Sequence, residues 1–418
     1  MVQSTGRVCA LVLATGVALI SALPAQSQRQ KAGTDPYTGG DADAIARLGY
    51  ESLGPFELGT GHDTLAVENL LGTEPLVWIE TRHFRIGCAL SPLRLRGQQD
   101  WSKEWIKKVK VELDELREKL PKGKLKKRVK TLDPWLRAHL MAQRLEKLYA
   151  EVRDVLDRDD EWFANGERDP RKAEEFAGLG PYLGMKEKYT VLMLQKGGSL
   201  ARYTRQYRGR EMEQPIRHHD QAFGSMYWGC SLESANNLFQ GDYALHASLA
   251  FNVAHNLYTG YRCFGHDLPP WLVTGLAHWH ARNVSPRFPV YDRKDDGDKR
   301  DRSPFWDWDA RVKGLIKHDV FEPLGDLVAH DSAGSFGIEQ HMQAWAVVDY
   351  LMASKPKQLA KFVHDLKSPF HGRVRMPTKE ELQQRQQQAF AAAFGSEVQA
   401  VDAAWRKDAS SKKKKRRR

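Results

Sequence analysis

The sequence has few cysteines and lacks the common nucleotide-binding and nucleophile motifs. Four cysteines occur in 418 residues, and no two of them form a C-x-x-C pair, so the usual thiolate zinc sites are not indicated. The chain contains no G-x-S-x-G, no phosphate-binding P-loop and no G-x-G-x-x-G pattern. Nucleophilic hydrolysis and nucleotide chemistry therefore have no support from the sequence.

Only one apolar run approaches the length of a membrane span. It follows a short cationic start, runs from Val8 to Ala25 as VCALVLATGVALISALPA, and ends in small residues. This pattern predicts a signal peptide over residues 1–27, so we expect the mature protein to be secreted or to reside in the periplasm or cell envelope. The alternative is an uncleaved membrane anchor, since about 18 apolar residues just span a bilayer.

Cleavage of the signal peptide would leave an odd number of cysteines. Cys9 would be removed, and Cys88, Cys230 and Cys263 would remain in an oxidising compartment. Both one disulfide with one free thiol and three buried thiols are consistent with this number.

The net charge of +11 is concentrated at the C-terminus. The last seven residues, Lys412 to Arg418, are all basic, while the body of the chain is nearly balanced. We expect residues 408–418 to form a disordered basic tail that adheres to anionic surfaces such as the cell envelope, and we expect no specific nucleic-acid partner.

The order of the hydrophobic patterns predicts an α+β fold. Residues 28–75 are rich in Gly, Asp and Ser and are expected to form a loosely packed, flexible arm. Residues 76–241 alternate strand-like and helical patterns and predict an α+β part with a small sheet, with a strand pair over 76–90 and a sheet edge over 223–241. Residues 242–407 are mainly helical, so strands come first and helices after, unlike an alternating parallel sheet.

The stretch FNVAHNLYTGYRCFGHDLPPWLVTGLAHWH, residues 251–280, has the outline of a zinc-peptidase core. In an H-E-x-x-H helix the two histidines lie about 40° apart on one face and bind the metal, with the glutamate beside them as general base. Here the second histidine is His255, but the first position is Phe251 and the base position is Asn252. A phenyl ring cannot bind Zn²⁺, and a carboxamide cannot accept a proton at neutral pH.

The second half of this stretch resembles the gluzincin, or peptidase MA-like, family of secreted bacterial metalloproteases. LPPWLVTGLAHWH, residues 268–280, is similar to the family's L-P-x-W-L-x-E-G-L-A-x-Y motif. The resemblance, which extends over about residues 76–370, implies a zincin-like fold for the helical part and an ancestral zinc-dependent peptide hydrolysis. It also implies that the third zinc ligand would stand at Thr274, where this sequence has no glutamate.

A zinc site with relocated ligands is the alternative that the histidines leave open. His246 lies about 180° around the same helix from His255, so these two cannot share a metal. His278 is the possible relocated ligand, together with His255 and some distant Asp or His. The simpler interpretation is that His255 remains from an ancestral site, that Phe251 fills the former metal volume, and that Asn252 and Thr274 hydrogen-bond one another or a water.

Two further clusters of polar residues are weaker candidates. Asp307 and Asp309 lie among aromatic residues, where a solvated helix start is the simpler interpretation than a carboxylate pair. The sequence RHHD, residues 217–220, is expected to be a surface loop rather than a metal site.

The sequence therefore leads to three hypotheses. The first is a secreted gluzincin-like protein that has lost zinc and hydrolytic activity and keeps its cleft to bind a peptide or protein, without any cofactor. The second is an active zinc metallopeptidase with relocated ligands. The third is a protein that binds anionic polymers or the cell envelope through its basic tail.

Overall fold

The computed structural model describes residues 34–72, 74–95, 103–234, 236–262, 266–288, 290, 307–373, 376–395 and 397–411. The strands are β1 (Tyr50–Ser52), β2 (Glu57–Gly59), β3 (His62–Asp63), β4 (Val77–Thr81), β5 (Phe84–Cys88), β6 (Leu93–Arg94), β7 (Thr131–Leu132), β8 (Tyr189–Leu194), β9 (Ile216–Asp220) and β10 (Ser225–Ser231). The first six α-helices are α1 (Ala42–Arg47), α2 (Thr64–Leu71), α3 (Lys103–Lys119), α4 (Pro134–Val155), α5 (Asp160–Asn165) and α6 (Gly197–Arg208).

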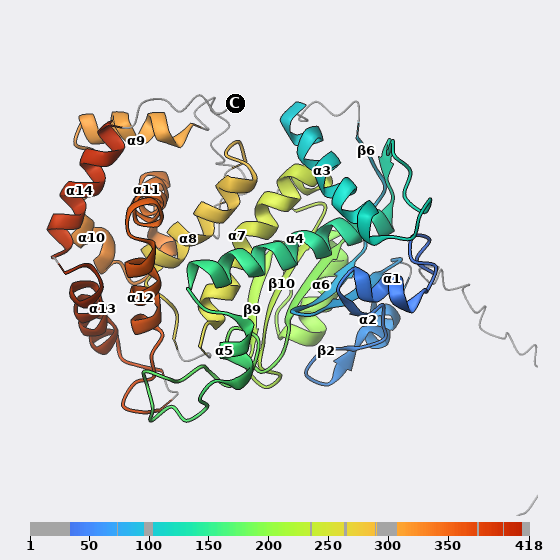
Figure 1. Ribbon diagram of the computed structural model, residues 1–418, viewed down its shortest axis with the longest axis horizontal. Coiled ribbons are helices and arrows are strands. Elements are labelled where there is room, and N and C mark those ends of the chain that lie inside the picture. The colour runs from blue at the N-terminus through green and yellow to red at the C-terminus, as the bar shows by residue number, and fades with distance from the viewer. Residues whose placement is uncertain are drawn as a thin grey trace, which may run out of the picture.

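The remaining helices follow the last strand. They are η1 (Leu238–Gln240), α7 (Asp242–Gly260), α8 (Pro270–Val284), α9 (Trp308–Lys317), α10 (Leu324–Ala329), η2 (Ala333–Ser335), α11 (Ile338–Ser354), α12 (Pro356–Leu366), α13 (Lys379–Phe394) and α14 (Val398–Ser411). The predicted α+β class, with a mainly helical C-terminal part, is confirmed. Figure 1 shows the sheet on one side, the C-terminal helices on the other, and α7 and α8 between them.

A six-stranded mixed sheet forms the centre of the N-terminal part, in the order β1-β4-β5-β8-β10-β9. Strands β5, β8 and β10 are parallel, whereas β1, β4 and β9 run antiparallel to their neighbours. In β8, Val191 and Met193 contribute to one hydrophobic cluster and Leu192 and Leu194 to another. This alternation follows from the two-residue period of a strand, and it buries β8 on both faces.

Helices cover both faces of this sheet. Helices α4 and α7 pack on one face, and α2 and α6 pack on the other. Helix α4 begins where Asp133 accepts a hydrogen bond from the backbone N–H of Leu136 and Pro134 occupies the first turn, two features that favour a helix start. In α3, Trp105, Val109 and Leu113 lie four residues apart and form one buried stripe.

Three predicted segments differ from their observed structure. The described part of 28–75, expected to be a loose arm, supplies the edge strand β1, which pairs with β4. The expected edge 223–241 is the inner strand β10, and the outer strand is β9, which contains the RHHD sequence assigned to a loop. Helix α14 continues through Ser411, so the first four residues of the predicted tail are helical.

The cysteines that the structure describes are thiols. Cys88 on β5 and Cys230 on β10 both lie opposite Met193 of the intervening strand, which places them two strand spacings apart, about 9–10 Å. A disulfide needs the two Cα atoms within about 7 Å. Both thiols are buried, and burial raises the pKa of Cys88 to about 12. Cys263 lies outside the described residues.

None of the described helices combines the length and apolar character needed to cross a membrane. The predicted signal peptide, residues 1–27, and the basic run 412–418 lie outside the described residues.

A buried histidine between two carboxylates joins the β4–β5 turn to α4 and α5. His83 Nδ1 lies 2.7 Å from Glu146 Oε2, and His83 Nε2 lies 3.6 Å from Asp160 Oδ2. Burial opposes the charge on His83, but its hydrogen bonds to the two carboxylates outweigh burial and raise its pKa. Burial likewise opposes ionisation of Glu146, yet His83 lowers the pKa of Glu146, and the hydrogen bond from His83 lowers that of Asp160 to about 2.

The pKa shifts in this cluster predict the pH range in which the cluster stabilises the fold most. Because the pKa of His83 is raised in the folded protein, its stabilising contribution is full below pH 6.5, the ordinary pKa of histidine. The contribution is lost as the pH rises through the pKa of the folded protein. The lowered pKa of Glu146 gives stability that is complete above 4.5 and is lost as the pH falls. The difference in free energy of unfolding between the wild type and His83→Gln, measured by urea titration, should therefore peak between pH 4.5 and 6.5. A difference that stays constant from pH 3 to 9 would contradict the assignment.

Candidate functional site

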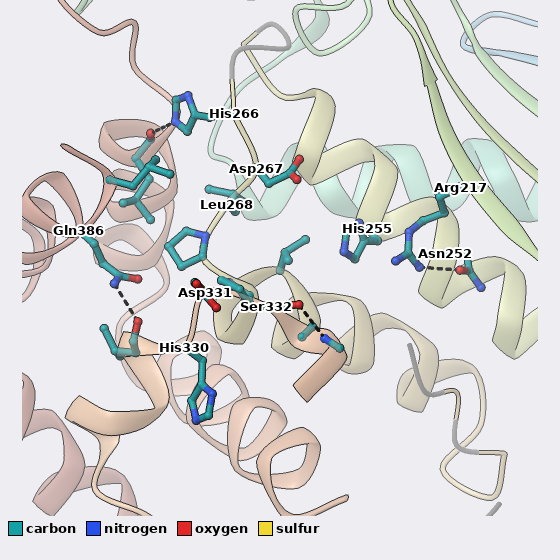
Figure 2. A pocket seen from close by; sticks show the side chains of 18 of the residues that line it. Arg217, Asn252, His255, His266, Asp267, Leu268, His330, Asp331, Ser332 and Gln386 are labelled. Carbon is teal, nitrogen blue, oxygen red and sulfur yellow. Dashed lines mark hydrogen bonds between the residues drawn. The ribbon is translucent and has the colours of Figure 1, made fainter. Parts of the chain in front are cut away.

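A cavity of about 900 Å³ lies between the sheet edge and the C-terminal helices. One wall is β9 with the residues before it, and the opposite wall is formed by residues 328–334 and by α13. Helix α7 contributes Ser248, Asn252 and His255, and the start of α8 contributes Pro270 and Val273. Figure 2 shows Arg217, Asn252 and His255 on one side of the open space and Gln386 on the other.

Helix α7 is buried on almost every side, and this burial fixes which of its side chains reach the cavity. Apart from Tyr243, His246 and His255, every residue of the helix is buried. His246 lies 5.8 Å, ring to ring, from Trp105 of α3, away from the cavity that His255 lines. The two histidines thus face different neighbours, as the helical geometry predicts.

Asn252, at the position of the general base in the zinc motif, has both ends of its amide engaged. Its Nδ2 donates to the Ser248 carbonyl oxygen at 2.9 Å and to Ser248 Oγ at 3.2 Å. Its Oδ1 accepts from Arg217 Nη1 at 2.7 Å. Asn252 and Thr274 therefore do not hydrogen-bond one another, because Ser248 and Arg217 take the bonds of this amide.

His255 is the one histidine of α7 on the cavity wall. It is half-buried, and its Nδ1 lies 3.4 Å from Thr259 Oγ1, one turn further along the helix. In the view of Figure 2 the guanidinium of Arg217 lies between His255 and Asn252.

Phe251, Thr274 and His278 do not line the cavity. Phe251 is buried with Ala277 and Ala281 of α8, and its ring centroid lies 4.8 Å from that of His278. Thr274 is completely buried, and its Oγ1 has no hydrogen-bond partner among the described residues. The structure thus brings Asn252 and His255 to the cavity and buries the other residues behind them.

His278 belongs to a buried aromatic group rather than to the cavity. Its Nε2 lies 2.9 Å from His341 Nδ1, and its ring packs against Trp308. Burial, followed by the neighbouring His341 and Arg282, lowers the pKa of His278 well below its ordinary value. His278 is therefore neutral, and it lies beside His341 and Phe251 instead of on the cavity wall with His255.

The cavity wall does not suit a zinc ion. Within the described ranges, no three His, Cys, Asp or Glu side chains lie close enough together to hold a metal. In addition, the guanidinium of Arg217 lies against Asn252, the residue at the general-base position. A fixed positive charge at that point opposes binding of a divalent cation. We therefore assign no step through zinc.

The two weaker candidates have structural roles. Asp307 accepts a hydrogen bond from the backbone N–H of Ala310 and so caps α9, and Asp309 is exposed in the first turn, as the helix-start interpretation predicts. In β9, Asp220 accepts a hydrogen bond from Arg208 Nη1 at 2.7 Å. Burial and His218 lower the pKa of His219 to about 4.

Arg217 is the functional candidate that sequence reasoning missed. It belongs to the RHHD sequence that was assigned to a surface loop, so its contact with Asn252, 35 residues away, was not foreseen. No local signal marks residues 216–220 as a strand, because the run is polar; only its pairing with β10 places Arg217 beside α7.

No protein-family model matches this chain, and no curated protein aligns with it significantly.

Proposed function

We propose that this protein is a secreted, gluzincin-like pseudo-peptidase that binds an extended peptide in the cavity beside β9 without cleaving it. The observation that carries the proposal is the hydrogen bond between Arg217 and Asn252 on the cavity wall. Asn252 stands at the general-base position and its amide accepts a hydrogen bond from the Arg217 guanidinium. Neither group can take a proton from water, so this pair serves binding rather than activation of water.

The shape and position of the cavity support a peptide as the ligand. Strand β9 is the last strand of the sheet, and outer strands pair with extended chains through their backbone groups. The cavity is at the upper end of the range found for ligand pockets, about 300–1,000 Å³, so it accommodates several residues. Its apolar lining, which includes Leu268, Val273 and Phe288, offers contacts for alternate side chains.

Blocking the cavity should weaken peptide binding strongly. Ala329 is exposed and lines the cavity, so Ala329→Trp places an indole in the ligand's path. We expect unstructured peptides of about eight residues, the length of a strand, to bind the wild type and to bind this variant at least about tenfold more weakly. Fluorescence anisotropy with labelled peptides measures the two dissociation constants.

Ala391→Trp is the matched control, because Ala391 is exposed on α13 and does not line the cavity. Binding to this variant should equal that of the wild type. If the wild type binds no peptide, or if both tryptophan variants bind equally well, the proposed function is wrong.

The rival metallopeptidase hypothesis makes a different prediction. With relocated ligands, His255→Ala and His278→Gln would each abolish zinc binding and peptide hydrolysis. We expect neither zinc-dependent hydrolysis in the wild type nor a change in the metal content of either variant, as measured by elemental analysis after dialysis against zinc.

A further inference from the structure

The connection between α3 and α4 is dense in positive charge. Residues 122–130 read KGKLKKRVK, with five lysines, one arginine and no acidic residue. All six basic side chains are exposed, and none of them has an ion-pair partner among the residues that the structure describes. We call residues 122–130 the basic loop. It presents a concentrated positive charge to the solvent.

The backbone of the basic loop is held in place from the inside. Leu125 is buried in the hydrophobic cluster between α3 and α4. Arg117 of α3 donates to the carbonyl oxygens of Leu125 and Lys126, at 3.3 Å and 3.2 Å. At the end of the loop, the backbone N–H of Leu95 donates to the carbonyl oxygen of Lys130 at 2.9 Å. Because the backbone is already fixed, a partner that binds the outward side chains does not have to order the loop.

Neighbouring elements add positive charge at both ends of the basic loop. Arg94 on β6 is exposed and stands opposite Thr131, the residue that follows the loop. Before the loop, Lys119 is exposed, and Arg47 Nε of α1 donates to its backbone oxygen at 3.1 Å. The fold therefore gathers cations around the loop that are distant from it in the sequence.

The acidic residues in the last turns of α3 do not neutralise this charge. Glu112 and Glu115 bond to side chains of α4. Asp114 pairs with Arg117 of its own helix. Glu118 is exposed and offsets one positive charge at most. Like charges this close repel one another, so a partner that carries many negative charges relieves the repulsion.

The composition of the basic loop fits a surface that displays many phosphate groups. Five of the six cations are lysines, whose ammonium groups are hydrated point charges that attract phosphate without a bidentate geometry. The loop has no aromatic side chain that could stack on a nucleic-acid base or a sugar ring. Clusters of about four to eight Lys and Arg residues bind anionic lipid headgroups, and each cation near the surface contributes about fivefold in affinity.

The basic loop and the cavity lie on different sides of the molecule. Figure 1 shows the connection between α3 and α4 away from α10 and α13, the two helices that contribute to the cavity wall. A membrane bound at the basic loop would therefore leave the cavity open to the solution.

We propose that the basic loop, with Arg94 and Lys119 beside it, docks this protein on the phosphate headgroups of an anionic lipid membrane. This contact belongs to the folded body of the protein and is separate from any contact that the terminal run 412–418 makes. It is also independent of the peptide binding proposed above.

Vesicle binding by the full chain tests the proposal. We expect the protein to sediment with vesicles of equal parts phosphatidylglycerol and phosphatidylcholine, and not with vesicles of phosphatidylcholine alone. The triple variant Lys126→Gln, Lys127→Gln and Arg128→Gln should bind the anionic vesicles about a hundredfold more weakly, because each lost cation costs about fivefold. Binding of the wild type should also weaken as the salt concentration rises, because salt screens exposed charges.

Two controls separate the basic loop from net charge and from the terminal run. Lys317→Gln, Lys357→Gln and Lys407→Gln together remove three exposed cations from the C-terminal helices, and should change vesicle affinity by at most about twofold. A full-length variant with Gln at every position of 412–418 should still bind anionic vesicles, and the loop substitutions should weaken its binding by the same factor. Since all substituted side chains in both triple variants are exposed, their thermal unfolding and peptide binding should match the wild type.

Three results would overturn the proposal: no binding to anionic vesicles, equal binding by the two triple variants, or complete loss of binding when only 412–418 is neutralised. If the wild type does not bind vesicles but is retained on heparin or duplex DNA through the loop, the partner is a soluble polyanion and membrane docking is wrong. None of these results bears on peptide binding in the cavity, which is measured separately.

Discussion

Arg144→Ala should lower the free energy of unfolding by about 3–5 kcal/mol, the typical cost of breaking a buried ion pair from one side. Arg144 on α4 donates to both carboxylate oxygens of Asp242, at 2.8 Å and 2.9 Å, and also to Glu112 of α3. The Asp242 side chain is completely buried, so the variant leaves an uncompensated charge at the first residue of α7. Urea unfolding followed by circular dichroism measures the loss.

Two comparisons test this explanation. Arg205→Ala removes an exposed partner of Glu211 and should change the free energy of unfolding by at most about 1 kcal/mol. The double variant Arg144→Met with Asp242→Leu removes both charges and should recover much of the loss. If the double variant is as unstable as Arg144→Ala, the cost lies in packing and not in the isolated Asp242 carboxylate.

Gly275→Ala should destabilise the protein by about 1–3 kcal/mol even though alanine is the better helix former. A Cβ at Gly275 would lie 2.5 Å from the backbone oxygen of Ala344 and 2.6 Å from Val348 Cγ2, both on α11. Backbone cannot yield as a flexible side chain does, so α8 would have to move away from α11. Because α8 also supplies part of the cavity wall, peptide binding should weaken as well.

Gly314 provides the control within the same protein. It lies in α9, and a Cβ there would have no atom within 4 Å, so Gly314→Ala should stabilise by about 0.5–1 kcal/mol. Thermal unfolding of the two variants should therefore shift in opposite directions. Equal upward shifts would show that α8 and α11 do not pack closely at Gly275.

The sequence predicted the elements whose pattern is strong. The partial alternation of β-branched and aromatic residues over 76–90 indicates a strand pair, and the structure has β4 and β5 there, paired antiparallel. The spacing of Trp105, Val109 and Leu113 indicates one buried stripe, and that stripe is buried on α3. These signals are local, so they can be recognised without knowledge of the partner element.

The sequence did not predict elements that depend on distant partners. Strand β9 contains the polar run RHHD, which has no hydrophobic alternation, and its pairing with β10 decides its conformation. Strand β1 lies in a Gly-rich region and exists because β4 offers an edge. The contact between Arg217 and Asn252 could not be predicted for the same reason, because it joins a strand and a helix whose packing no local pattern in the sequence indicates.

Native mass spectrometry of the full chain with an excess of peptide and zinc tests the central claim most directly, because one mass reports the ligand, its integrity and the metal. The proposed function predicts a complex whose mass is that of the protein plus one intact peptide, with no bound zinc, and predicts that the complex is absent for Ala329→Trp. A species that contains zinc, accompanied by shortened peptide, would contradict it.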